Sequence, residues 1–237
     1  MDNETTNRTS LIFKVWIGLT MNNLASLGFL KNSIVETIVS TYNSKGQANA
    51  APMGVKTEKT NHIVIRPYAS TLTYTSLQSK RCAVINVTSN PELYYRTAFK
   101  KANPEGRIPP EWFEKAETVD APRLRMAEAF VEVSVVNIKS LGTERAEVLC
   151  DAKLIKASSL LPKAYCRATF ATIEAIIHAT RVKLFLAGDR QKQEQAHMLM
   201  ELIEHYNAIV NRIAPNSRYS AIMADLTQRI NSWKAKS

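Results

Sequence analysis

The stretch IVETIVSTYNSKGQANAAPMGV (Ile34–Val55), followed after a short polar break by IVIRPYASTLTYTSLQSKRCAVINVT (Ile63–Thr88), decides the fold. Its first run, residues 34–41, alternates and is rich in β-branched side chains, which favours a strand. Residues 42–47 carry Asn, Ser and Gly, which tolerate the positive φ angles of a hairpin turn. The sequence therefore predicts a β-hairpin whose second strand covers residues 48–56.

The returning strand is unusual because it is built from small residues that are followed by Pro52 and Gly54. Such residues give up side-chain packing, and a proline cannot donate a hydrogen bond to the strand ladder. Two interpretations are open at this point. The segment is either an edge strand with a bulge or a place where a flat ligand approaches the backbone.

The second half of the stretch predicts a phosphate site. His62–Ile65 has the pattern of a strand and ends on Arg66, and the Ser/Thr-rich run that follows begins with residues that cap helices. A helix start offers unpaired N–H groups, and a guanidinium forms paired hydrogen bonds to phosphate. The candidates are Arg66, Ser70, Thr71 and Thr73, although an ordinary helix cap beside a surface arginine has the same pattern.

The remaining chain adds strands and then turns helical. Strands are predicted at 82–88, 127–138 and 146–157, and a charged, proline-rich excursion at 100–122 contains a short helical prospect at 111–117. Six strands with few connecting helices favour a small barrel over a doubly wound parallel sheet. Apolar residues that repeat at helical spacing predict three C-terminal helices, over about 162–186, 196–213 and 219–233.

The composition is that of an ordinary globular protein. The net charge of +10 over 237 residues is not concentrated in a basic tail or stripe, which argues against a nucleic-acid partner. Three widely spaced cysteines predict neither a disulfide framework nor a metal site and suit a cytoplasmic protein. The apolar segment 11–30 is interrupted by Lys14, Asn22 and Asn23, so we expect no membrane span.

One constellation in the first predicted C-terminal helix carries possible chemistry. Glu174, His178 and Arg181 are spaced by four and three residues, so they share one helix face. They are either an ionic cluster at a ligand site or subunit interface, with His178 as proton donor, or a polar lock between helix and barrel. A histidine without a paired base favours the lock. No Ser-His-Asp order, paired-carboxylate spacing, P-loop or GxGxxG motif supports a hydrolase or a nucleotide triphosphatase.

The chain resembles the DUF447 family, whose members join an FMN-binding split barrel, akin to flavin reductases and pyridoxamine-phosphate oxidases, to a helical region. With the sequence pattern, the resemblance implies an α+β fold with a flexible N-terminal segment (1–26), an FMN-binding split β-barrel (27–157) and a C-terminal helical bundle (158–237). The four segments that carry the resemblance are Glu36–Val55, Arg66–Leu77, Val84–Thr88 and Cys166–Val182.

The resemblance also implies a ligand and a function. FMN would lie in a groove of the barrel near the interface of a homodimer, in an oxidoreductase with a small-molecule substrate or a redox partner. The alternative is a non-catalytic flavin-binding or electron-relay module, and the family's association with tetrahydromethanopterin-linked chemistry extends this to a pterin-linked one-carbon role. The implied FMN-binding residues are Asn49, Ala50, Ala51, Pro52, Met53, Gly54 and Val55 against the ring, Arg66, Ser70, Thr71 and Thr73 at the phosphate, and Ser40, Thr41 and Asn86 at the ribityl chain or ring.

Overall fold

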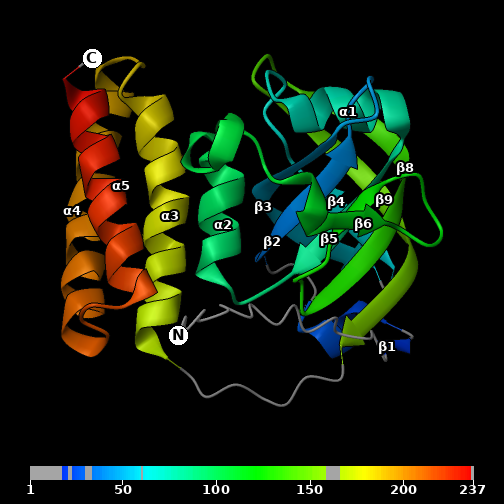
Figure 1. The fold of residues 1–237 in the computed structure, drawn as a ribbon. Helices are drawn as coiled ribbons and strands as arrows, with labels where there is room; N and C mark the ends of the chain where they lie inside the picture. The colour runs from blue at the N-terminus through cyan, green and yellow to red at the C-terminus, as the bar shows by residue number, and fades with distance from the viewer. Residues whose placement is uncertain (1–17, 21–22, 30–33, 60, 159–165, 236–237) are drawn as a thin grey trace, which may run out of the picture.

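A barrel of antiparallel strands stands beside a bundle of helices (Figure 1). The protein's structure is a computed structural model, which describes residues 18–20, 23–29, 34–59, 61–158 and 166–235. Its strands are β1 (Gly18–Thr20), β2 (Ile34–Tyr42), β3 (Ala48–Lys59), β4 (His62–Ile65), β5 (Cys82–Val87), β6 (Phe113–Lys115), β7 (Pro122–Leu124), β8 (Ala129–Leu141) and β9 (Arg145–Ser158). Its helices are α1 (Leu72–Lys80), α2 (Pro91–Ala98), α3 (Arg167–Phe185), α4 (Arg190–Ile213) and α5 (Arg218–Lys234), and its short 3-10 helices are η1 (Leu24–Leu27), η2 (Lys100–Ala102), η3 (Pro104–Gly106) and η4 (Pro110–Trp112).

The predicted hairpin is present, and its turn fixes the register. The side-chain oxygen of Asn43 accepts the N–H groups of Lys45 and Gln47, at 2.9 Å each, and Gly46 adopts a φ of +75°. Such a turn suits two twisted antiparallel strands. β2 and β3 then pair without interruption from Tyr42 opposite Ala48 down to Ile34 opposite Lys56.

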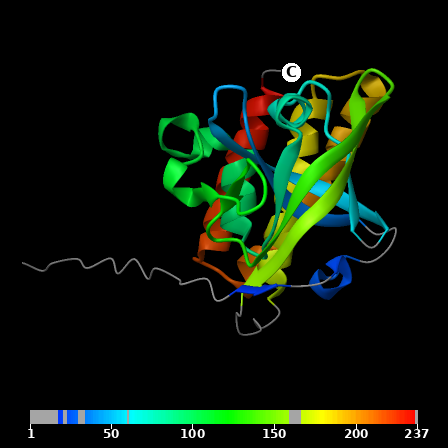
Figure 2. The ribbon, with the colours of Figure 1, turned by 90° about the vertical axis from the view of Figure 1, so that its right-hand side faces the viewer.

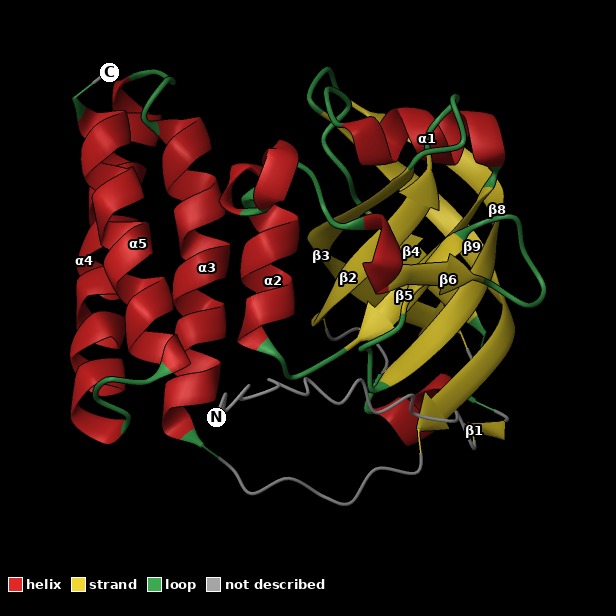
Figure 3. Cartoon of the chain, in the orientation of Figure 1, coloured by secondary structure: helices red, strands yellow, loops and turns green. Residues whose placement is uncertain are grey.

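Six strands close into the predicted split barrel. Neighbours follow the order β2, β3, β4, β9, β8 and β5, and β5 returns to β2, all in antiparallel pairs. The barrel interior is filled by alternate apolar side chains of these strands, which include Val39, Val55, Ile85 and Val133. The α+β fold with a C-terminal helical bundle is confirmed, and Figure 3 shows the strands and the bundle as two neighbouring parts.

The barrel begins earlier in the chain than the predicted boundary at residue 27. β1 pairs with the end of β9, and Leu24 of η1 is fully buried in the barrel core together with Phe29. η1 lies at the end of the barrel opposite α1, which contributes Leu77 to the same core (Figure 1). A flexible segment up to residue 26 is therefore wrong for residues 18–20 and 23–26, because apolar burial and strand pairing hold them. Residues 1–17 lie outside the described residues.

Two further boundaries differ from the sequence prediction. The helical prospect at 111–117 is wrong, because η4 and the strand β6 occupy this region and β6 pairs with β7. Ser158 still belongs to β9, and the first long helix begins at Arg167. The predicted helix start near residue 162 lies outside the described residues. None of the described helices is both long and apolar enough to cross a membrane.

Helix α2 joins the barrel to the bundle. It stands between β3 and α3 (Figure 1), and the Tyr94 hydroxyl donates to the carbonyl of Glu36 on β2 at 2.8 Å. Ala50 and Ile38, on the outer face of the hairpin, share one apolar cluster with Leu93 and the bundle. Figure 2 shows the long β8–β9 hairpin reaching toward the α3–α4 turn, where Lys192 pairs with Glu144 at 3.2 Å.

A buried amide holds three strands together. The Asn86 side-chain nitrogen donates to the carbonyl of Ile38 at 2.8 Å and to the Ser40 hydroxyl oxygen at 2.9 Å. Its oxygen accepts the N–H of Leu124 at 2.8 Å, and the Ser40 hydroxyl donates to the carbonyl of Pro122 at 2.5 Å. Asn86 and Ser40 are both fully buried. This network, which we call the Asn86 lock, ties β2, β5 and β7 together.

We expect Asn86→Ala to lower the free energy of unfolding by about 2–4 kcal/mol, because it leaves several buried backbone groups without partners. Chemical denaturation monitored by circular dichroism measures the change. Asn137→Ala, at an exposed strand position of β8, is the matched control and should cost less than about 0.5 kcal/mol. Equal stabilities of the two variants would show that the lock contributes nothing.

Candidate functional site

The first half of β3, before Val55, has an edge without a neighbouring strand. The N–H of Asn43 donates to the carbonyl of Gln47 at 2.9 Å, so Asn43 and Gln47 form a hydrogen-bonded pair of the ladder. Hydrogen-bonded and non-hydrogen-bonded pairs alternate in an antiparallel ladder, so the next hydrogen-bonded pair on β3 is at Asn49 and the one between, at Ala48, has no such bonds to β2. The even-numbered residues of β3 therefore turn their peptide groups away from β2. β4 pairs with β3 only from Val55 onward, and no strand among the described residues runs beside the earlier part. We call the peptide groups of Ala48, Ala50 and Pro52 the open edge.

Pro52 occupies the position in this pattern where a proline costs least. It stands opposite Ile38 in a pair that needs no N–H bond to β2, and it borders the open edge with its carbonyl alone. The register with β2 is unbroken at Pro52, so the alternative of a bulge at this point is wrong. The small side chain of Ala50 serves another purpose, because it lets α2 pack closely on the outer face.

Gly54 is required by its neighbours on β2. A Cβ atom at this position would lie 2.8 Å from Cγ2 of Ile34 and 3.2 Å from a carboxylate oxygen of Glu36. The glycine therefore makes room for two side chains of this chain. Ile34 is 70% exposed, so this end of the hairpin presents apolar surface to solvent.

The predicted phosphate residues lie together at the start of α1. Thr71 caps the helix, since its hydroxyl oxygen accepts the N–H of Tyr74 at 3.3 Å, and Ser70 is exposed beside it. The first N–H groups of a helix have no intrahelical partner and carry partial positive charge. Thr73 is 2% exposed and belongs to the buried side of α1. The Thr71 hydroxyl donates to the carbonyl of Tyr68 at 2.7 Å, so Ser70 and the N–H groups of the first helical turn are better placed for an anion than the side chains of Thr71 and Thr73.

Two arginines stand next to this helix start. Arg66, half-exposed, donates from Nε and Nη2 to Glu147 at 3.0 and 2.6 Å. Arg145 lies over the ring of Tyr68 at 3.9 Å and donates to the carbonyl of Arg66 at 3.2 Å. Arg145 was not among the predicted residues, because only the pairing of Tyr68 with the start of β9 brings it here. No local sequence signal marks it.

The other polar residues predicted to contact FMN differ in whether their side chains already have hydrogen-bond partners within the chain. Ser40 and Asn86 belong to the Asn86 lock and have their hydrogen bonds within the chain. Thr41 and Asn49 stand opposite each other across β2 and β3, and both are buried. The Thr41 hydroxyl and the Asn49 side-chain nitrogen have no hydrogen-bond partner. The side-chain oxygen of Asn49 accepts a hydrogen bond from the Lys100 ammonium.

Unsatisfied buried polar atoms are rare in folded proteins and call for an explanation. Those of Thr41 and Asn49 lie at the start of β3, where the open edge begins. Ala51, Met53 and Val55 share their side of the strand, with Val55 buried in the barrel core and Met53 packed against it. The start of β3 therefore combines free peptide groups with free side-chain donors.

The predicted face of α3 meets a carboxylate of the barrel. Burial raises the pKa of Glu36, the guanidinium of Arg181 opposes this rise and the carboxylate of Glu174 adds to it. Burial likewise lowers the pKa of His178, whose Nδ1 atom has no partner and whose ring lies 5.8 Å from that of Tyr206 on α4. The side chains of Glu174 and Arg181 thus lie within electrostatic reach of β2, as a lock between helix and barrel requires.

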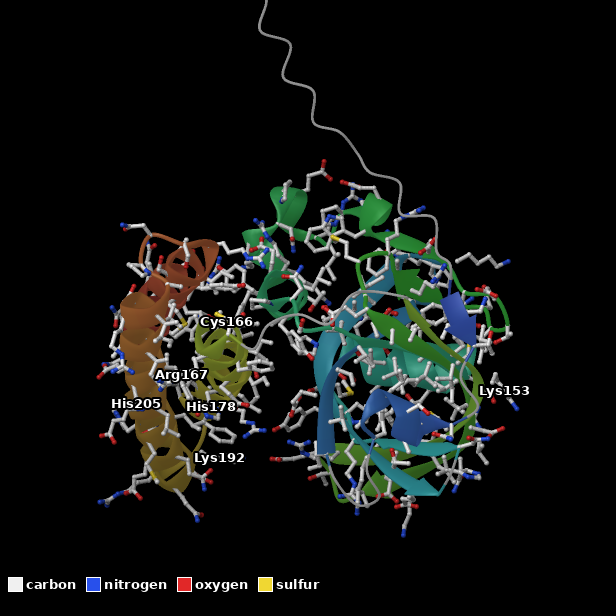
Figure 4. All side chains as sticks on the ribbon, turned by 90° about the horizontal axis from the view of Figure 1, so that it is seen from below. Lys153, Cys166, Arg167, His178, Lys192 and His205 are labelled. Atoms are coloured by element: carbon white, nitrogen blue, oxygen red, sulfur yellow. The ribbon has the colours of Figure 1, made fainter. Side chains whose placement is uncertain are left out.

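Figure 4 shows His178 and His205 on the helical side of the molecule, far from Lys153 on the outer barrel. His178 belongs to α3, and His205 belongs to α4, where its ring contacts that of Tyr206 edge-on. Among the described residues, no three His, Cys, Asp or Glu side chains form a group that could hold a metal ion.

Comparison with known proteins adds a family and a fold. A family model described as "Protein of unknown function (DUF447) N-terminal domain" matches residues 35–158, whereas no curated protein matches the chain. The structure of an FMN-bound DUF447 protein from Methanosarcina mazei has a TM-score of 0.67 at 23% identity over 86% of this chain and 98% of that one.

Two other solved structures are more distant. A 2-nitrobenzoate 2-nitroreductase from Pseudomonas fluorescens has a TM-score of 0.42 at 19% identity, over 57% of this chain and 72% of that one. A flavoredoxin from Desulfovibrio vulgaris has a TM-score of 0.41 at 13% identity, over 67% and 78%. At these scores neither carries weight for this chain, so the fold comparison depends on the M. mazei protein.

Because the folded state raises the pKa of Glu36, it binds the Glu36 proton more tightly than the unfolded chain does. The free energy of unfolding should therefore fall as the pH rises from the ordinary glutamate pKa through the raised one. We expect Glu36→Gln to lose less stability across this window than the wild type, measured by denaturation at a series of pH values. Glu111→Gln, at an exposed position, is the control. Superimposable profiles for wild type and Glu36→Gln would contradict this role of Glu36.

Proposed function

Because the chain belongs to the DUF447 N-terminal-domain family, we propose that it is a flavoprotein that binds FMN along the open edge of β3 and takes part in oxidation–reduction chemistry. The observation that carries the proposal is the combination of free peptide groups at Ala48, Ala50 and Pro52 with the unpartnered buried atoms of Thr41 and Asn49. The FMN bound to the related M. mazei protein supports the choice of ligand.

The residues present fit the phosphate of FMN. Arg66 and Arg145 supply two guanidinium groups, Ser70 supplies a hydroxyl, and α1 supplies the positive end of a helix dipole. The Thr71 hydroxyl donates to the carbonyl of Tyr68 at 2.7 Å, so Thr71 contributes by capping the helix. Glu147 binds one edge of the Arg66 guanidinium and leaves Nη1 for the ligand. A phosphate needs several such donors at once, and this is the place in the barrel where they come together.

The residues also fit the polar part of the flavin ring and ribityl chain. The peptide N–H and C=O groups of Ala48 and Ala50 and the carbonyl of Pro52 can bond ring nitrogens and oxygens, and Thr41 and Asn49 can bond polar atoms at the buried end of the edge. FMN, when bound, supplies hydride or electron transfer, while the protein supplies binding and orientation. Ser40 and Asn86 position β2 and β5 through the Asn86 lock and do not contact the ligand in this proposal.

A homodimer is part of the proposal. The exposed Ile34 side chain lies beside Gly54, at the border of the same strand that presents the open edge. A second copy that covered this apolar surface would also exclude water from the ligand.

The substrate class and electron donor follow from a donor screen: bleaching of the bound flavin by reduced nicotinamide would favour an oxidoreductase, and slow turnover with every donor and acceptor would favour an electron-relay module.

We expect FMN to bind the purified protein with quenching of flavin fluorescence, and Arg66→Ala and Arg145→Ala each to raise the Kd by roughly tenfold, the effect of one charge-assisted hydrogen bond. Riboflavin, which lacks the phosphate, should bind wild type and both variants equally weakly. Arg107→Ala, on the exposed surface where Arg107 pairs with Glu105, is the matched control. Failure of the wild type to bind FMN would refute the proposal, and an equal loss for riboflavin would remove the arginines from the phosphate.

A further inference from the structure

A lysine from outside the barrel reaches the buried end of the open edge. Lys100 lies in η2, directly after α2, and its ammonium donates to the side-chain oxygen of Asn49 on β3. The two residues are 51 positions apart in the chain. The contact therefore depends on how α2 packs against β3, and no sequence motif predicts it.

The hydrogen bond to Lys100 decides the orientation of the Asn49 amide. An ammonium has only donors, so it must meet the amide oxygen, and the amide nitrogen must then point elsewhere. Asn49 is only 5% exposed, and its nitrogen has no partner. Across the ladder the Thr41 hydroxyl, also buried, is equally without a partner, whereas Thr37, four pairs further along, donates to the carbonyl of Met53 at 2.9 Å. The Thr57 hydroxyl, at the far end of β3, is also without a partner, but Thr41 and Asn49 place two unmet donors opposite each other at the end that Lys100 reaches.

The charge of Lys100 is also unmatched. Among the described residues no carboxylate forms an ion pair with it, and burial lowers the pKa of its ammonium. A half-buried cation with a neutral amide as partner is costly to maintain. Such a cost is explained when the cation faces a ligand that is rich in electrons.

We propose that Lys100 is a positioning residue of the flavin site: it fixes the Asn49 amide with its nitrogen toward the ligand, and its positive charge favours the reduced state of that ligand. The inference rests on the proposed function. An ammonium one amide group away from the ligand stabilises the negative charge that a flavin gains on reduction, because opposite charges attract more strongly where water is excluded. Lys100 should thus strengthen FMN binding and raise the midpoint potential of bound FMN.

Lys100→Met tests this, because methionine keeps most of the apolar stem and removes the charge. With FMN as the probe, we expect a Kd about tenfold higher, as for loss of one charge-assisted hydrogen bond. We also expect a more negative midpoint potential, measured by equilibration with a reference dye during reduction by dithionite. Lys101→Met, at the exposed neighbouring position, should match the wild type in both, and Lys100→Arg should restore the potential in part.

Asn49→Asp separates a role toward the ligand from a purely structural one. The carboxylate would form an ion pair with Lys100, so the fold should be as stable as in the wild type, but the variant lacks the amide donor and neutralises the cation. We expect weaker FMN binding and a more negative potential despite a wild-type thermal midpoint. Unchanged Kd and potential in Asn49→Asp or in folded Lys100→Met would overturn this inference alone. A wild-type protein that binds no FMN would overturn the proposed function with it.

Discussion

The length mismatch between β3 and its two neighbours determines where this barrel can receive a ligand. β3 has 12 residues and β4 has four, so β2 covers β3 almost completely while β4 covers only its second half. A strand buried in a barrel normally satisfies its backbone on both sides. Here the chain leaves β4 at Arg66 and crosses to α1, and the first half of β3 keeps one side unpaired. The positive helix start and the two arginines stand where the chain departs, which explains why free peptide groups and anion-binding groups occur in one region.

The helical part contributes to this region through α2. It packs on the small Ala50 side chain, is tied to β2 through Tyr94 and delivers Lys100 to Asn49. Further contacts hold α2 on the bundle, since the Tyr95 hydroxyl donates to Asp225 of α5 and Arg229 donates to Tyr95 at 3.1 Å. The bundle is thus coupled to the start of β3 through one helix, while Glu36 and the polar face of α3 provide a second contact at the other end of the hairpin.

Much of the fold could be predicted from the sequence because its signals are local. Alternating β-branched residues predicted β2, and the Asn-Ser-Lys-Gly turn predicted the hairpin. Apolar residues spaced alternately by three and four positions predicted α4 and α5. η1 and β1 could not be predicted, since their order comes from burial of Leu24 and from pairing with β9, both distant in sequence. The β6–β7 pair was missed for the same reason, because three-residue strands carry too little pattern to be distinguished from a helical turn.

The candidate site was predicted less completely than the fold. Arg66, Ser70 and Thr71 could be proposed from the sequence because a strand end followed by helix-capping residues is a local pattern, and the structure places them between the end of β4 and the start of α1. Arg145 and Lys100 come from segments distant in sequence, and only strand pairing and helix packing bring them in. Conversely, Ser40 and Asn86 looked like ligand donors because they are polar residues in apolar strands. Their donors are used within the Asn86 lock, an outcome that depends on Pro122, 82 residues from Ser40, and on Leu124, 38 residues from Asn86.

The central claim is that the open edge of β3 is the surface that receives FMN. Amide hydrogen exchange, resolved by residue across positions 48–55 with and without saturating FMN, tests it most directly. The N–H groups of Asn49, Ala51 and Met53 bond to β2 and should exchange slowly in both states. That of Ala48, which is only partly buried, should be unprotected in the free protein and become protected when FMN is added. An Ala48 amide whose exchange is the same in both states, although FMN is bound, would contradict the claim and place the ligand elsewhere.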